Sequence, residues 1–93
     1  MVIYIAGKMT GLPDYGRDKF RTAQEELEAG GYTVINPAVL PTTLRKESYM
    51  PICMAMIDAA DAIYALKGFD KSVGALLEIH YARYQGKDVI YQK

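Results

Sequence analysis

The chain has 93 residues, of which 51% are hydrophobic and 24% charged, so we expect one small globular domain over residues 1–93 with a modest core. Lysine and arginine, 11 together, balance 11 aspartate and glutamate residues, and a chain without a basic excess is not expected to bind a nucleic acid polymer. No apolar run approaches the roughly 18 residues that cross a bilayer, and the single cysteine fits a reducing, cytoplasmic setting, so we expect neither a membrane partner nor a disulfide.

The chain opens with a strand, a loop and a helix. Residues Val2–Ala6 form a short β-branched and aromatic run that Gly7 closes, which predicts a buried strand. The stretch from there to Gly16 holds a proline and further glycines and is a loop, in which Asp14 is placed to cap a helix. Within Arg17–Ala29 apolar residues recur at helical spacing, and a Gly-Gly pair follows, as is common where a helix ends.

The middle of the chain predicts a second strand and a second helix. Tyr32–Ile35 is a short apolar run that an Asn-Pro pair ends. Ala38–Ser48 is a polar connection. Tyr49–Ala60 follows as an apolar segment with Pro51 in its first turn, where a helix tolerates proline.

The predicted helix Tyr49–Ala60 is apolar nearly all round, whereas a surface helix normally shows one apolar stripe. A deeply buried core helix is the alternative, but a domain of this size has little room for one. We therefore expect a homodimer or a higher homo-oligomer through this helix, with adaptable methionine side chains in the interface.

The last part of the chain predicts a strand, a helix and a strand. Ala62–Leu66 is the third apolar run, and Val89–Tyr91 is the fourth. Between them Val73–Tyr84 predicts a helix, and either Ser72 or Asp70 can cap it.

Short apolar strands that alternate with helices indicate an α/β fold with a parallel sheet covered on both faces. Right-handed crossovers then give a flavodoxin-like, Rossmann-like three-layer sandwich, with a four-stranded parallel sheet in the order 2-1-3-4. Ligands of such sheets bind beyond the carboxyl ends of the strands, where the strand order reverses. The loops Gly7–Asp14 and Lys67–Ser72 are expected to meet there, and each precedes a helix N-terminus that favours an anion.

Glu78 interrupts the apolar pattern of the last predicted helix. Three of its four neighbours at helical spacing are small: Gly74, Ala75 and Ala82. A carboxylate flanked by small residues can face an open pocket beside the helix. The alternative is a surface glutamate on a half-exposed helix.

Five segments carry a resemblance to a known family. They are IYIAG at Ile3–Gly7, MTGLPDY at Met9–Tyr15, NPA at Asn36–Ala38, DAIYAL at Asp61–Leu66, and GFDKSVGALLEIHYARYQGK at Gly68–Lys87. The chain resembles the nucleoside 2-deoxyribosyltransferase superfamily, and within it a group of short bacterial and phage proteins. The similarity covers nearly the whole chain, and its last segment is the most specific.

The resemblance implies roles for two residues. Glu78 matches the family's nucleophile in a G-x-x-x-E segment, which attacks the anomeric carbon of a deoxyribose and expels the base. Tyr4 matches the first-strand tyrosine that orients this glutamate. The alternative for Tyr4 is a core aromatic residue whose hydroxyl needs a partner.

The resemblance also implies a binding region for a small-molecule nucleoside or nucleotide. Ser72 stands where the related deoxynucleoside 5′-monophosphate N-hydrolases bind phosphate, although a plain helix cap is its alternative and both roles can coexist. The other implied contacts lie in the first loop and at the start of the last helix: Gly7, Lys8, Thr10, Gly11 and Gly74. Lys8 is either a cationic partner of the phosphate or a solvated lysine.

One position departs from the family's pattern. Its members carry an aspartate eight residues ahead of the residue that Asp61 matches, where it helps to protonate the leaving base. Cys53 stands there, and a thiol is a poor proton donor. We expect it to be a small buried hydrophobic residue. His80 has no second ligand at metal-binding spacing, so neither a metal nor another cofactor is expected.

Two functions therefore remain open, because a third, a purely structural or adaptor oligomer, would explain the methionine-rich helix but leave Glu78 and the two glycine loops unexplained. One is a nucleoside 2-deoxyribosyltransferase or a deoxynucleoside 5′-monophosphate N-glycosidase, which works through the Glu78 carboxylate. The alternative is a catalytically weak or inactive module that binds a nucleotide or related metabolite as an oligomer, which the Cys53 substitution favours.

Overall fold

The computed structural model describes all 93 residues and confirms the predicted α/β sandwich. The strands are β1 Val2–Ala6, β2 Thr33–Ile35, β3 Ala62–Ala65 and β4 Asp88–Tyr91. The helices are α1 Arg17–Ala29, α2 Lys46–Asp58 and α3 Val73–Tyr84. The strands form one parallel sheet in the order β2-β1-β3-β4, as expected.

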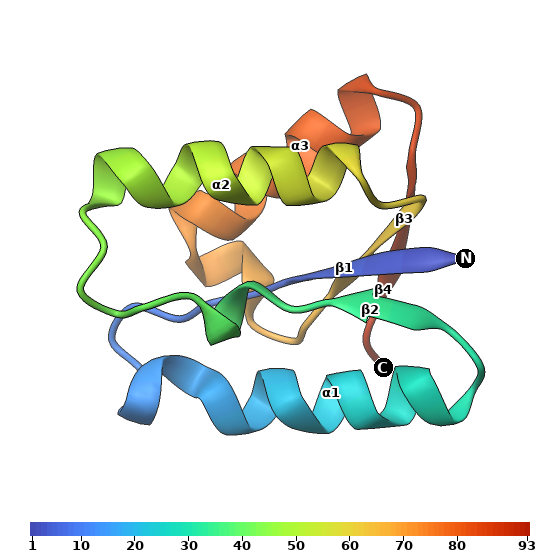
Figure 1. The fold of residues 1–93 in the computed structure, drawn as a ribbon, viewed down its shortest axis with the longest axis horizontal. Helices are drawn as coiled ribbons and strands as arrows, with labels where there is room; N and C mark the ends of the chain where they lie inside the picture. Colours follow the sequence, from blue (N-terminus) through green and yellow to red (C-terminus); the bar gives the residue numbers. More distant parts are fainter.

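The helices divide unequally between the two faces of the sheet. Figure 1 shows α1 on one face and α2 and α3 together on the other. The chain moves in one direction from β1 to β2, and in the opposite direction from β2 to β3 and on to β4. Because each crossover is right-handed, a reversal of direction places the connecting helix on the opposite face.

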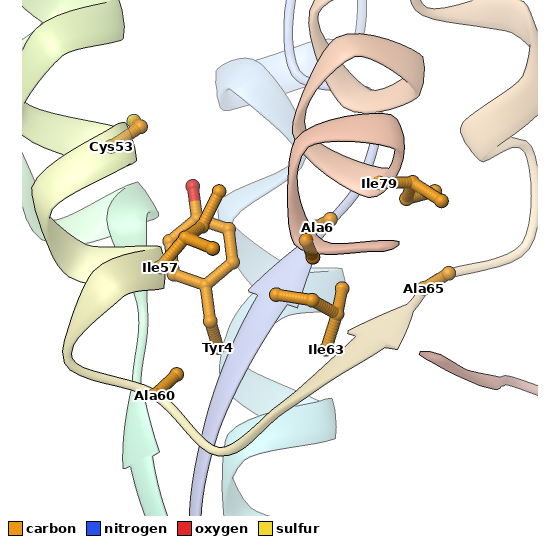
Figure 2. Close-up of a cluster of buried hydrophobic side chains, with 9 residues drawn as sticks. Tyr4, Ala6, Cys53, Ile57, Ala60, Ile63, Ala65 and Ile79 are labelled. Carbon is orange, nitrogen blue, oxygen red and sulfur yellow. The ribbon is translucent and has the colours of Figure 1, made fainter. Parts of the chain in front are cut away.

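The strand β1 lies at the centre of the sheet and of the core. Its residues Ile3 to Ala6 are fully buried, because β2 and β3 flank β1 and helices cover both of its faces. The larger buried cluster lies between the sheet and the α2–α3 pair (Figure 2) and includes Tyr4, Cys53 and Ile79. The smaller cluster lies under α1 and includes Phe20.

Several predicted boundaries shift by one to three residues. The main correction concerns α2, which begins at Lys46 rather than Tyr49 and ends at Asp58 rather than Ala60. Its first turn is polar, so apolar periodicity missed it. The second strand lacks the expected Tyr32, the third ends one residue before Leu66, and the fourth begins one residue earlier, at Asp88.

The expectation that Asp14 caps α1 is wrong. The N-cap is Gly16, in a left-handed conformation and without a side-chain cap. Asp14 belongs to the preceding 3-10 turn, and its carboxylate lies 3.8 Å from the guanidinium of Arg17. Asp14 and Tyr15 have φ values of 50° and 55°, a left-handed conformation that costs non-glycine residues free energy.

The expected interface helix has two buried residues, Cys53 and Ile57. Ile52, by contrast, is 37% exposed, and Met54 and Met56 are half-buried. An oligomer through α2 stays a prediction. None of the three helices combines the length and the apolar character that a bilayer crossing requires.

Candidate functional site

A cavity of about 530 Å³ opens at the carboxyl ends of β1 and β3. It lies where the loop after β1 meets the start of α3, as the topology predicts. Its wall includes five of the expected site residues besides Glu78: Gly7, Lys8, Thr10, Ser72 and Gly74. The sixth, Gly11, does not line the cavity and is exposed, with open space around it.

Glu78 is buried in the second turn of α3 and reaches this cavity. Its residue is only 6% exposed, yet it forms part of the cavity wall together with Gly74 and Ala75. These small residues lie one turn earlier on the same helix face, so they leave the carboxylate uncovered. The prediction that Glu78 faces a pocket is therefore confirmed, and the surface alternative is wrong.

The Tyr4 hydroxyl donates a hydrogen bond of 3.1 Å to Oε1 of Glu78. Tyr4 is fully buried, and Figure 2 shows its ring rising from β1 beside α2, with the hydroxyl at the end nearer Cys53. The two residues are 74 positions apart in the chain. The hydrogen bond fixes one of the two carboxylate oxygens.

Burial raises the pKa of Glu78 to about 7, because a low-dielectric surrounding disfavours the charged form. Hydrogen bonds from Tyr4 and from Cys53 oppose this rise. The pKa of Tyr4 is raised well above its ordinary value, first by burial and then by the Glu78 charge. At neutral pH, Tyr4 is therefore a neutral donor and Glu78 is close to half ionised.

Cys53 completes this buried group. It lies one turn after Tyr49 on α2, and Tyr4, Tyr49 and Glu78 all influence the pKa of its thiol. It is fully buried, as expected. Burial raises the pKa of the thiol to about 11, so the group is a neutral thiol at physiological pH.

The two loops at the cavity mouth are joined by their own contacts. Nζ of Lys8 donates to the carbonyl oxygen of Lys71 at 3.4 Å. The Ser72 hydroxyl accepts from the amide of Ala75 at 3.1 Å, which confirms Ser72 rather than Asp70 as the cap of α3. The cap holds the hydroxyl beside the free N–H groups of the helix end.

Three lysines line the cavity: Lys8, Lys46 and Lys71. The structure's only ion pairs, Arg17 with Asp14 and Arg21 with Asp18, involve none of them. Lys46 is the first residue of α2, where the positive end of the helix dipole disfavours a cation. Three ammonium groups and one carboxyl group therefore line this cavity, in a chain of zero formal net charge.

Close packing explains the glycine that follows β1. A Cβ atom on Gly7 would lie 3.0 to 3.2 Å from three side-chain atoms of Leu66. That distance is too short for an unstrained contact. The loop after β1 can therefore pass this close to the end of β3 only because residue 7 has no side chain.

A second cavity of about 370 Å³ adjoins the first and shares four wall residues with it: Met9, Thr10, Lys46 and Tyr49. Its remaining lining is largely apolar and includes Tyr15 and Leu40. Neither cavity holds a histidine, cysteine or aspartate in its wall, and Glu78 is the only acidic residue. No three His, Cys, Asp or Glu side chains gather in a group that could hold a metal.

The sequence analysis did not identify Tyr49 and Lys46 as residues of the cavity wall. The Tyr49 hydroxyl has two acceptors within reach of its single proton, Sδ of Met9 at 3.0 Å and the Pro37 carbonyl oxygen at 3.3 Å. The spacing of one helical turn from Tyr49 to Cys53 was the available signal. A lysine at the start of a helix, against the dipole, was the signal for Lys46.

Comparison with solved structures confirms the expected resemblance in fold. A 2-desoxiribosyltransferase from Leishmania mexicana matches with a TM-score of 0.78 and 23% identity, over 97% of this chain and 62% of that protein. A 2-deoxyribosyltransferase from the psychrotolerant bacterium Bacillus psychrosaccharolyticus matches with a TM-score of 0.75 and 19% identity, over 98% of this chain and 71% of that protein. At such identities the likeness shows a shared fold.

Sequence comparison adds a family. Among curated proteins, none matches the chain. A family model described as "Domain of unknown function (DUF4406)" matches residues 1–91. Because this match spans nearly the whole chain, the chain belongs to that family.

Proposed function

We propose that the chain cleaves the N-glycosidic bond of a deoxynucleoside or a deoxynucleoside 5′-monophosphate, with Glu78 as nucleophile. The observation that carries this proposal is a buried carboxylate, oriented by a tyrosine hydroxyl at 3.1 Å, in the wall of a 530 Å³ cavity. The volume of this cavity lies within the range of small-molecule pockets, about 300 to 1,000 Å³.

The chemistry follows from the carboxylate. Oε2 of Glu78, the oxygen that Tyr4 leaves free, attacks the anomeric carbon while the bond from that carbon to the base nitrogen breaks. The electron pair of the bond goes to the base, and a glycosyl ester forms on Glu78. A second base or water then attacks the same carbon and releases the carboxylate. The negative charge of Glu78 also stabilises the positive charge that develops on the sugar.

The pKa of Glu78, about 7, suits this role. A nucleophilic carboxylate must be ionised, and a value near the working pH keeps a large ionised fraction without strong hydration. Tyr4 is the orienting residue in this scheme because its neutral hydroxyl can only donate to the carboxylate. The implied roles of Glu78 and Tyr4 thus agree with their observed geometry.

The mouth of the cavity supports a phosphorylated substrate. The Ser72 hydroxyl and the N-terminus of α3 lie beside the three lysines Lys8, Lys46 and Lys71 in the same wall. Unpaired ammonium groups and helix N–H groups bind phosphate oxygens well. We therefore favour the deoxynucleoside 5′-monophosphate N-glycosidase over the nucleoside transferase, although both solved relatives are named for deoxyribosyl transfer.

The second candidate is a binding module without turnover. It is favoured by Cys53, whose neutral thiol, with a pKa of about 11, stands where the resemblance expects an aspartate. Such a module would hold a nucleotide in the same cavity. This second proposal includes a homo-oligomer that the module forms through α2.

The test is chromatography of free base after incubation with a panel of deoxynucleosides and deoxynucleoside 5′-monophosphates, with and without an acceptor base. Glu78→Gln is the inactive variant, and Glu25→Gln, an exposed change on α1, is the matched control. Release of base by the wild type and by Glu25→Gln, but not by Glu78→Gln, supports the proposal. A product nucleoside that carries the acceptor base establishes transfer. No release, together with a nucleotide-induced rise in Tm, establishes the binding module.

A further inference from the structure

The two cavities contain one carboxylate and no second acid. Glycosidases commonly use a pair of carboxyl groups, one as nucleophile and one as the general acid that protonates the leaving group. Here Glu78 is the only acidic residue in either cavity wall. One carboxyl group cannot be the ionised nucleophile and the protonated acid in the same step.

The other groups near Glu78 are poor replacements for that acid. Cys53 is fully buried and does not line either cavity, so its thiol does not contact a base held there, and burial raises the pKa of the thiol to about 11. Tyr49 lines both cavities, but burial raises the pKa of its hydroxyl well above the ordinary value. The ammonium groups that line the first cavity are much weaker acids than a carboxylic acid.

A base can leave without a proton if it already carries a positive charge. When the bond from the anomeric carbon to a quaternised ring nitrogen breaks, the bonding pair neutralises that charge, and the base departs as a neutral molecule. The Glu78 carboxylate forms the ester in the same step. Water then attacks the anomeric carbon, gives its proton to solvent and restores the carboxylate. No general acid takes part in this sequence.

The three lysines in the cavity wall add a second condition on the charge of the substrate. A nucleoside with a cationic base has a net positive charge, and Lys8, Lys46 and Lys71 would repel it at the cavity mouth. A 5′-phosphate reverses this, because it places negative charge against the lysines and leaves the positive base for the carboxylate. The charges of the cavity thus match a zwitterionic nucleotide.

Resting on the proposed function, we propose that the preferred substrate is a nucleoside 5′-phosphate whose base carries a fixed positive charge, such as an N-alkylated purine. The single carboxylate in the cavity walls and the three unpaired lysines at the mouth carry this inference. General acid catalysis is worth about 10²- to 10⁴-fold in rate. A substrate that does not need it gains a factor of that order over its neutral counterpart.

The experiment compares 7-methyl-2′-deoxyguanosine 5′-monophosphate, 2′-deoxyguanosine 5′-monophosphate and 7-methyl-2′-deoxyguanosine, each corrected for release without protein. The sugar is the same throughout. We expect the methylated monophosphate to lose its base at least about 100-fold faster than the unmethylated one. We expect it to exceed the phosphate-free nucleoside by about tenfold in kcat/KM. Glu78→Gln should abolish all release, and Glu25→Gln should not.

Each other outcome decides against the inference. Equal release from the methylated and unmethylated monophosphates refutes it but leaves the proposed glycosidase intact. Equal kcat/KM with and without the phosphate refutes the role of the lysines. Absence of release from all three substrates, and from the whole panel of unmodified deoxynucleosides and monophosphates, by folded wild-type protein refutes the proposed function itself.

Discussion

Replacing Glu78 with glutamine should make the protein more stable above neutral pH. The pKa of the Glu78 carboxyl is about 7 in the folded state against 4.5 for the free group. The folded protein therefore binds this proton more tightly than the unfolded chain does. Below the unfolded pKa the carboxyl is neutral in both states and costs nothing. As the pH rises through 4.5 and past 7, the native state must hold a buried charge, and stability falls.

The size of this effect follows from the same values. One pKa unit corresponds to about 1.4 kcal/mol, so the buried charge costs on the order of 3 kcal/mol once the pH exceeds the folded pKa. Glutamine has nearly the same shape and no charge. The variant should match the wild type near pH 4 and exceed it by up to about 3 kcal/mol at pH 8.

Urea unfolding of both proteins at pH 4, 6 and 8 measures this difference, because all other titrating groups are common to the pair. Glu25→Gln again serves as the control, since Glu25 is exposed on α1. A stability difference between Glu78→Gln and wild type that does not change with pH would refute the reasoning. So would a variant less stable than wild type at pH 8.

Three further changes test other parts of the site. Tyr4→Phe removes the 3.1 Å hydrogen bond to Glu78, worth about 1.5 to 3 kcal/mol to a charged partner, and should raise the Glu78 pKa by at least about one pKa unit. A ¹³C NMR titration of the carboxyl carbon checks this, and an unchanged or lower pKa contradicts it. Gly7→Ala forces a Cβ to within 3.0 Å of the Leu66 side chain and should destabilise the fold by about 1 to 3 kcal/mol in urea unfolding; an unaltered midpoint would show that the loop can move aside. Lys46→Met should weaken the binding of a deoxynucleoside 5′-monophosphate by about tenfold, measured by calorimetry on a Glu78→Gln background. A deoxynucleoside without phosphate should bind equally to both proteins, and an equal loss for both ligands would place Lys46 outside the phosphate region.

The fold was predictable because local signals and tertiary structure agree over most of this chain. The bounds of α1 and α3 follow the predicted ranges, since a glycine pair ends one and Ser72 caps the other. The start of α2 was missed because residues Lys46 to Ser48 are polar, so no apolar periodicity marks them. The strand order followed from handedness, which depends on geometry common to all such sheets.

The site was only partly predictable, for a different reason. Glu78 breaks an apolar helix, and that local break can be seen in the sequence. The approach of Lys46 to the start of α3 depends on how α2 crosses the sheet, which no local pattern encodes. The raised pKa of Glu78 likewise depends on its burial in the folded chain, and the opposing effects come from Tyr4 on β1 and Cys53 on α2.

The central place of β1 has a consequence during synthesis. Within residues 1–93 this strand is made before the other three, and it lies between β2 and β3. Its second partner begins only at Ala62, so one edge of β1, with the apolar residues Ile3 and Ile5, stays unpaired in a nascent chain even after β2 has formed. Unpaired strand edges of this kind invite association with other chains and with chaperones. Because Tyr4 stands in this strand and Glu78 in α3, the two halves of the site meet only after the chain has been made through α3.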